Sequence, residues 1–173
     1  MTTELKAPTG FGAVFAAIDP DNPDYALLQC IVSRLIPFGT HAGVVVSELG
    51  PDRAVVEVPA EAHLGNHLGT VHAGAQFLAA DVAGACAFVG AMATRLSAIG
   101  SFVLRDSRVA FRKPALGRLR AVGTIDRNDV ETVLASVGEQ RLDVDGRALL
   151  FDEAGVLVGK VQLDYVVTLV QEA

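Results

Sequence analysis

Hydrophobic residues recur along this chain with two different periods. Residues 23–36, PDYALLQCIVSRLI, place apolar side chains three and four positions apart, which predicts an amphipathic helix that ends at Pro37. The segments GVVVSEL (43–49) and RAVVEVP (53–59) are β-rich and are separated by a turn, so they predict two short strands. A loop rich in Gly, His and Asn follows over residues 60–71.

The next segment, residues 73–93, is AGAQFLAADVAGACAFVGAMA, a run of small and apolar residues that contains one acid, Asp81. It is long enough to cross a membrane. However, Ala and Gly contribute little transfer free energy, and a central Asp costs roughly 2.5–3.5 kcal/mol on insertion scales. A helix without a polar stripe is buried on nearly all sides. The segment therefore predicts the buried central helix of a soluble protein.

After this helix the pattern changes to β. Four strands are expected, at 101–113, 118–125, 141–151 and 156–169. The turn DEAG joins the last two as a hairpin, and a short helix at 128–138 is expected to be capped by Asn128 or Asp129. The element order predicts an α+β fold with one antiparallel sheet of about 5–6 strands around one central helix. An edge strand of such a sheet could pair with a second copy of the chain.

Composition narrows the class of protein. The chain has 173 residues, of which 51% are hydrophobic and 20% charged, so we expect one soluble domain with its core at about 25–168 and a loose segment at 1–20. The net charge of −6 argues against general nucleic-acid binding. Cys30 and Cys86 are expected to be reduced core thiols of a cytoplasmic protein, since the N-terminus does not resemble a signal peptide and the cysteines form no metal-ligand pattern.

Asp81 is the first candidate for chemistry. A carboxylate buried in an apolar helix is costly unless it has a partner. It could be a structural residue, paired with an arginine from a strand or facing a small water pocket. It could equally be a general base or nucleophile in a cleft, with a pKa set by its surroundings.

The start of the same helix is the second candidate. His72 could simply cap the helix and Asn66 could be an ordinary turn residue. Both nevertheless lie beside a helix N-terminus, where free backbone N–H groups of Ala73 and Gly74 could hold a carbonyl oxygen or an oxyanion. Nine residues separate His72 from Asp81, so Asp81 lies about 13.5 Å further along the axis and half-way round the helix. One small reacting group cannot touch both, so a shared site would need two copies of the chain.

The third candidate is a group of cations on two strands expected to be adjacent: Arg105, Arg108, Arg112, Lys113, Arg118 and Arg120. These residues could form a solvated face of the sheet. Alternatively, they could anchor the phosphates of an anionic ligand on an otherwise acidic protein.

These residues resemble a known family. The pattern N-x-x-G-x-x-H-x-G, with Asp nine residues after the His on a long Ala/Gly-rich helix, is similar to hotdog-fold acyl-CoA thioesterases of the phenylacetate-pathway type. The segment FRKPALGRLRA (111–121) resembles that family's strand–Pro–x–x–Gly–strand signature. Two further segments also resemble this family, and especially a related, poorly characterised branch of it: LIPFGTHAGVVVSELGPDRAVVEVP and FDEAGVLVGKVQLDY. The resemblance covers residues 25–168.

The resemblance implies roles for single residues. Asp81 would be the general base or nucleophile, Asn66 would place the water or the thioester, and the Ala73 N–H beside His72 would polarise the carbonyl, with Gly74 alongside. The shared sites would lie across a homodimer or a dimer of dimers. No metal or other cofactor is implied, since CoA belongs to the substrate. Two positions depart from the family: Ala73 replaces the usual Gly, and Leu104 stands where some members carry Ser or Thr.

Three functions therefore stay open. The first is hydrolysis of an acyl-CoA to acid and CoA, with the CoA phosphates held by some of Arg105, Arg108, Arg112, Lys113 and Arg118. The second is non-enzymatic binding of an acyl-CoA or lipid. The third is a hydratase or dehydratase on the same fold, which would use a His paired with an acid at spacings that this chain does not have.

Overall fold

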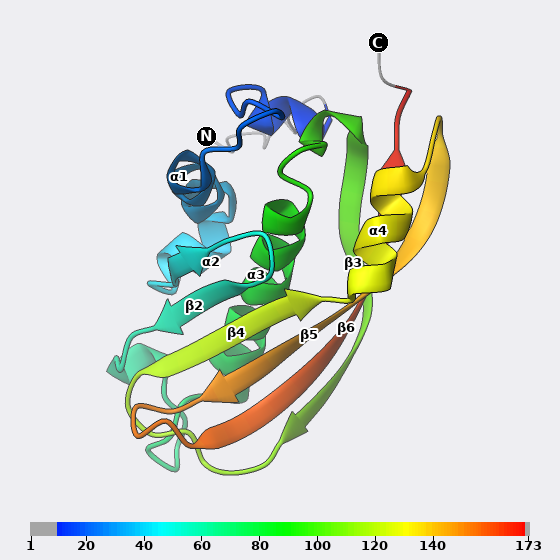
Figure 1. Cartoon of the computed structure of the whole chain (residues 1–173). Helices are drawn as coiled ribbons and strands as arrows, with labels where there is room; N and C mark the ends of the chain where they lie inside the picture. Colours follow the sequence, from blue (N-terminus) through cyan, green and yellow to red (C-terminus); the bar gives the residue numbers. More distant parts are fainter. Residues whose placement is uncertain (1–9, 172–173) are drawn as a thin grey trace, which may run out of the picture.

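Helix α3 (Ala73–Ala91) passes through the middle of the molecule, and a single antiparallel sheet curves around it (Figure 1). The computed structural model describes residues 10–171. The sheet has six strands in the order β1-β2-β4-β5-β6-β3. Their bounds are Val45–Leu49 (β1), Ala54–Val58 (β2), Ile99–Phe111 (β3), Leu119–Ile125 (β4), Gln140–Phe151 (β5) and Leu157–Leu169 (β6). The predicted α+β architecture is confirmed.

The sequence explains where the helices begin. In α1 (Tyr25–Leu35), Asp24 Oδ1 accepts hydrogen bonds from the N–H groups of Ala26 and Leu27 at 2.9 and 3.0 Å, which is an N-cap. Pro37 was expected only to end this helix, but it also begins a second short helix, α2 (Pro37–His41). Proline fits the first position of a helix because its missing N–H would have had no partner there.

Helix α4 (Arg127–Ala135) lies where a short helix was expected, but its cap was predicted wrongly. The N-cap is Asp126, whose carboxylate accepts from Asn128 N–H at 2.9 Å, rather than Asn128 or Asp129. Asp129 instead accepts a hydrogen bond from the N–H of Asp145 on β5, at 2.8 Å. The carboxylate therefore ties α4 to the sheet, a long-range contact that the local pattern did not contain.

The order of the strands corrects one expectation. Strands β3 and β4 follow one another in the sequence and were expected to be adjacent, but β5 and β6 lie between them. β3 pairs with β6 along nearly all of its 13 residues and forms one edge of the sheet. Because β5 and β6 form a hairpin, β4 pairs with the first of them and β3 with the second.

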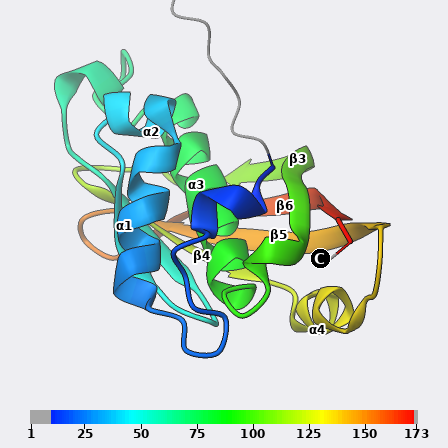
Figure 2. The same cartoon turned by 90° about the horizontal axis from the view of Figure 1, so that it is seen from above.

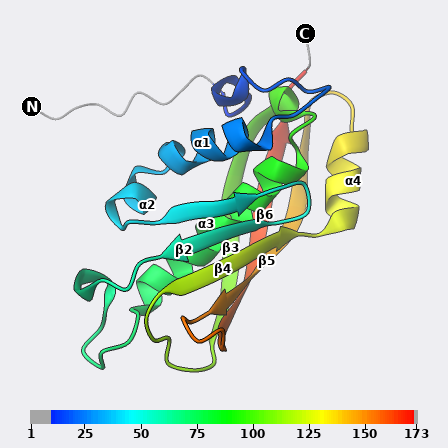
Figure 3. The same cartoon turned by 60° about the vertical axis from the view of Figure 1, so that its left-hand side comes forward.

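The small residues of α3 allow the helix to lie directly on the sheet (Figure 3, where β2 and β4 cross in front of α3). A Cβ atom added at Gly123 of β4 would collide with the backbone of Ala83. Added at Gly84, it would collide with the side chains of Leu163 and Tyr165 on β6. α3 is the one described helix that is long and apolar enough to span a membrane, but 67% of its most apolar window is buried inside the molecule.

The segment before α1 also contributes to the core. Of residues 1–20, which were expected to be loose, residues 1–9 lie outside the described part, whereas Phe15 and Ile18 are buried. They belong to a segment that includes the 3-10 helix η1 (Gly12–Phe15). Phe11, the residue before η1, donates its N–H to Gly100 O of β3 at 3.1 Å and so links this segment to the sheet. Two further 3-10 turns are η2 (Ala62–Leu64) and η3 (Leu96–Ala98). Cys86 is buried as expected, but Cys30 is exposed on α1 and is not a core residue.

Candidate active site

Asp81 lies in the third turn of α3 and is only partly buried, although residues before and after it are fully buried. Within residues 10–171 its carboxylate has no hydrogen-bond or ion-pair partner. Burial raises the pKa of Asp81 above the usual carboxyl range, because the charged form loses hydration that no protein group replaces. An unpaired carboxylate with a raised pKa in a partly open position has the properties of a general base.

Two other titratable side chains lie close to this carboxylate, Cys86 on α3 and Tyr165 on β6. Burial, with a smaller contribution from the charge of Asp81, raises the pKa of the Cys86 thiol to about 12, so the thiol is neutral at physiological pH. Burial, with smaller contributions from the charges of Asp81 and Cys86, raises the pKa of Tyr165. The Tyr165 side chain is 1% exposed, and its hydroxyl has no hydrogen-bond partner in the described structure.

The predicted helix start is confirmed, and His72 is its cap. His72 Nδ1 accepts a hydrogen bond from Gly74 N–H at 2.9 Å, so this N–H is not free as the sequence suggested. The Ala73 N–H, the first donor of the helix, has no acceptor among the described residues. Residues 72–74 are exposed. The exposed Ala73 N–H is therefore a backbone donor that remains available at this helix end for a carbonyl oxygen.

The loop before the helix uses the whole side chain of Asn66. Asn66 Oδ1 accepts from the N–H groups of Leu68 and Thr70 at 2.9 and 3.2 Å, and its Nδ2 donates to Thr70 Oγ1 at 2.9 Å. This is the turn-forming arrangement typical of Asn. Val71 N–H also donates to Ala115 O at 3.0 Å, which fixes the loop to the β3–β4 connection. In this structure Asn66 holds the shape of the loop.

Asp81 and the helix start do not form one site within a single chain. Both lie on the unbroken helix α3, about 13.5 Å apart along its axis. Phe77, Asp81 and Ala85 are nevertheless all partly exposed and follow one another at intervals of four, so they lie along one side of the helix.

The predicted phosphate anchors lie at different places on the sheet. Arg105 donates to Asp143 of β5 at 2.7 Å and Arg118 donates to Glu57 of β2 at 3.2 Å, so both are in ion pairs. Arg108, Arg112 and Lys113 are exposed and have no acidic partner within the described residues. Arg112 and Lys113 lie just before Ala115, which contacts the loop at the start of α3. Arg112 and Lys113 thus precede the segment that contacts the loop before α3, whereas Arg108 lies within β3 opposite Gln162.

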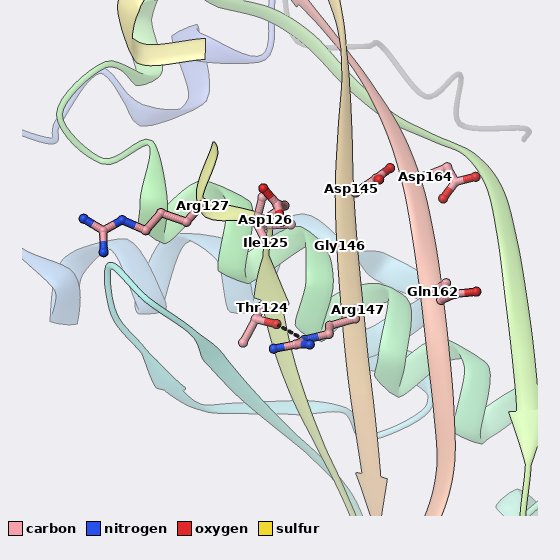
Figure 4. Close-up of a pocket in the computed structure, with 9 residues that line it drawn as sticks. All are labelled: Thr124, Ile125, Asp126, Arg127, Asp145, Gly146, Arg147, Gln162 and Asp164. Carbon is pink, nitrogen blue, oxygen red and sulfur yellow. Dashed lines mark hydrogen bonds between the residues drawn. The ribbon is translucent and has the colours of Figure 1, made fainter. Parts of the chain in front are cut away.

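A cavity lies elsewhere in the described structure (Figure 4). It has a volume of about 510 Å³ and lies near the start of α4, where its lining includes Asp126, Asp145 and Asp164. Repulsion from neighbouring carboxylates adds to burial in raising the pKa of Asp145. The lining also includes Arg127 and Arg147, so the cavity carries charges of both signs, and none of the predicted site residues lines it. Among residues 10–171 no group of three or more His, Cys, Asp or Glu is arranged to hold a metal ion.

The fold is shared with proteins of known structure. A crystal structure from Pseudomonas aeruginosa described as a probable thioesterase is similar over 84% of this chain and 96% of that one, with 20% identity and a TM-score of 0.66. A Shewanella oneidensis protein related to the thioesterase superfamily matches 83% of this chain and 94% of its own, with 20% identity and a TM-score of 0.64. The fold is therefore the hotdog fold of thioesterase-superfamily proteins, as predicted.

A more specific assignment comes from the family model. Residues 25–167 match the model described as "Domain of unknown function (DUF4442)", so the chain belongs to this family. A Thermus thermophilus protein of solved structure shares 27% identity over 76% of this chain and 97% of its own, with a TM-score of 0.55. None of the curated proteins compared with this sequence matches it.

Sequence reasoning missed two parts of the site. Tyr165 was not singled out, although it is the one inward-facing residue of β6 with a polar group among Val161, Leu163 and Val167. The segment before α1 was also missed: Phe11, Val14 and Phe15 line a cavity beside α3. Its Gly/Ala/Pro-rich composition gave no signal, because its aromatic side chains meet α3 only through tertiary packing.

Proposed function

We propose that this protein is an acyl-CoA thioesterase, which hydrolyses a thioester to a free acid and CoA. The observation that carries the proposal is Asp81, an unpaired, partly buried carboxylate of raised pKa on the central helix of a hotdog fold. Thioester hydrolysis needs a base or nucleophile and an oxyanion donor but no metal or redox cofactor. The free thiols of Cys30 and Cys86 are consistent with a cytoplasmic enzyme.

Asp81 acts on the thioester carbon in one of two ways. As a general base, it takes a proton from water while the water oxygen bonds to the carbonyl carbon. As a nucleophile, its carboxylate bonds to that carbon, CoA thiolate leaves, and water then opens the mixed anhydride. In the general-base route the tetrahedral oxyanion collapses, the C–S bond breaks, and the thiolate takes the proton from Asp81. In both routes the Ala73 N–H stabilises the developing oxyanion.

The active unit is a dimer or a dimer of dimers, with Asp81 from one copy and Ala73 from the other. Edge strand β3 supports this arrangement because it is long and one side of it is unpaired in the described structure. Val103 and Phe111 on this strand are 56% and 49% exposed, and an exposed apolar edge tends to pair with another strand. Arg108, Arg112 and Lys113 would hold the CoA phosphates.

The test is turnover of a panel of acyl-CoA esters, followed by detection of free thiol, by the wild-type protein and the Asp81→Asn variant. We expect the variant to lose at least about 100-fold in kcat, the lower range for a catalytic proton-transfer group. Asp52→Asn is the matched control, because Asp52 lies in the exposed turn between β1 and β2. Equal turnover by all three proteins would remove Asp81 from the chemistry.

The second candidate function is acyl-CoA binding without turnover. It is favoured by Leu104, which lies opposite Tyr165 in the β3–β6 ladder and offers no hydroxyl to the substrate. Under this function the wild-type protein would bind a medium-chain acyl-CoA in calorimetry and release no thiol from it over hours.

A further inference from the structure

A second cavity, of about 270 Å³, lies beside α3, is partly open to solvent and is lined by four separate parts of the chain. Figure 2 shows their arrangement: α1 runs beside α3, and the η1 segment lies over α3 next to β3. The lining residues come from the η1 segment (Phe11, Val14, Phe15), the end of α1 (Val32, Leu35, Ile36), α3 (Ala85, Cys86, Val89) and β3 (Phe102).

This lining is almost entirely hydrocarbon. Among the lining side chains, only Cys86 has a heteroatom that can form a hydrogen bond. Its thiol is uncharged because its pKa is raised. Apolar cavities in proteins stay dry and bind hydrocarbons, because water inside them would find no hydrogen-bond partners. The cavity thus suits an aliphatic or aromatic group and repels charged ones.

The cavity begins one helical turn from Asp81. Ala85 is four residues after Asp81 and therefore lies on the same face of α3, and Val89 continues this face by another turn. A thioester carbon placed at the Asp81 carboxylate could thus extend its acyl chain along α3 into the cavity. The CoA part would leave in another direction, toward the exposed side of the helix.

The far wall is held rigidly. Phe102 stacks on Phe88 at a centroid distance of 3.9 Å and on Tyr165 at 4.4 Å. Phe11 contacts Phe15 and Phe102 at centroid distances of 5.2 and 6.2 Å, while its N–H is bonded to Gly100 O. Phe11 and Val14 are only partly buried and Leu35 is 38% exposed, so these three residues form the part of the wall nearest to solvent.

We propose that this cavity is the acyl-binding pocket and that Phe11 and Val14 set the length of the acyl group it accepts. The inference rests on the proposed thioesterase function and names its substrate class. A cavity of about 150 Å³ holds the six carbons of benzene, so 270 Å³ holds about ten carbons. The preferred substrates are medium-chain or aryl-substituted acyl-CoA esters of about eight to ten acyl carbons.

The chain-length profile tests the pocket. We expect kcat/KM to rise about threefold to fourfold per added CH₂ from butanoyl-CoA and to reach its maximum near decanoyl-CoA. Val14→Phe fills the cavity and should lower kcat/KM for decanoyl-CoA at least about tenfold, while butanoyl-CoA changes less than about twofold. Phe11→Ala enlarges the cavity and should move the maximum to longer chains. Val137→Ala, at a side chain that is 83% exposed, is the control.

Direct binding separates this inference from the proposed function. Calorimetry with S-decyl-CoA, a thioether that cannot be hydrolysed, should show binding by the wild type that Val14→Phe weakens about tenfold, whether or not the protein turns over esters. If the wild type, Val14→Phe and Phe11→Ala hydrolysed esters with the same chain-length profile, the cavity would not be the acyl-binding pocket. The proposed thioesterase function would still stand. Thermal melting of each variant checks folding, and Val14→Phe, at a partly exposed site, keeps the test decisive if Phe11→Ala unfolds.

Discussion

The hydroxyl of Tyr165 lies directly against Gly84, in the space that a side chain at position 84 would occupy. Gly84 is one helical turn after Asp81, so this contact brings β6 to the part of α3 that carries the candidate base. Gly84→Ala should destabilise the protein by about 1–3 kcal/mol, because the new methyl group overpacks a buried contact with Tyr165 and Leu163. Chemical denaturation measures this change, and because helix propensity alone would favour Ala over Gly, a loss of stability identifies overpacking.

Tyr165→Phe should leave the free energy of unfolding unchanged or raise it by about 1 kcal/mol, since a buried hydroxyl without a partner costs desolvation free energy. The variant should also relieve part of the destabilisation by Gly84→Ala, and a double-mutant cycle gives the size of this coupling. A loss of several kcal/mol in Tyr165→Phe alone would mean that the hydroxyl has a strong partner in the native protein.

The raised pKa of Asp81 links stability to pH. The folded protein holds the Asp81 proton more tightly than the unfolded chain does, so stability falls as pH rises from the ordinary carboxyl pKa through the raised one. Asp81→Asn should therefore increase the melting temperature at pH 7, and the increase should vanish below about pH 4, where Asp81 is protonated in both states. Melting curves of the two proteins between pH 3 and 8 test this. An increase of constant size across this range would point to a cause other than ionisation.

Ala73→Pro removes the N–H proposed to hold the oxyanion without breaking the helix. Proline is well accepted at the first helical position, and His72 already has the extended conformation, φ −61° and ψ 142°, that a residue before proline prefers. We expect kcat to fall about 10²–10³-fold with little change in melting temperature. Ala75→Gly, two residues further along the same turn, is a control that keeps every backbone N–H.

The same variant tests whether the site is shared. Ala73→Pro and Asp81→Asn should each be inactive alone, but unfolding and refolding them together should restore about a quarter of wild-type activity, because about half of the dimers are mixed and each mixed dimer holds one intact site of two. If Asp81 and Ala73 acted within one chain, no activity would return on mixing.

Substitution of the exposed cations should change the binding of CoA without changing the chemical step. Arg112→Ala and Lys113→Ala should each raise KM for an acyl-CoA about tenfold, the loss expected for a hydrogen bond to a charged group. KM for the matching N-acetylcysteamine thioester, which has no phosphates, should not change. Arg105→Ala is the comparison, because Arg105 already pairs with Asp143 and should have a smaller effect. Equal effects on both substrates would place the CoA phosphates elsewhere.

Local patterns in the sequence determined the elements of this fold. The apolar run after His72 predicted the buried central helix, and the β-rich segments on either side of it predicted the strands, because such patterns depend only on neighbouring residues. The position of Asp81 within that run already marked a carboxylate that would be costly to bury. The nine-residue spacing from His72 also fixed the distance between the two candidate groups, since helix geometry is constant.

Only the tertiary structure decided what meets these elements. It placed β5 and β6 between β3 and β4, which split the cationic cluster, and it paired Arg105 and Arg118 with acids far away in the sequence. In the folded chain the Gly74 N–H donates a hydrogen bond to His72, and Phe11 lines the cavity beside α3. Strand order, side-chain pairing and cavity shape depend on contacts between segments that are distant in the sequence. Such contacts produce no periodic pattern of residues from which they could be predicted.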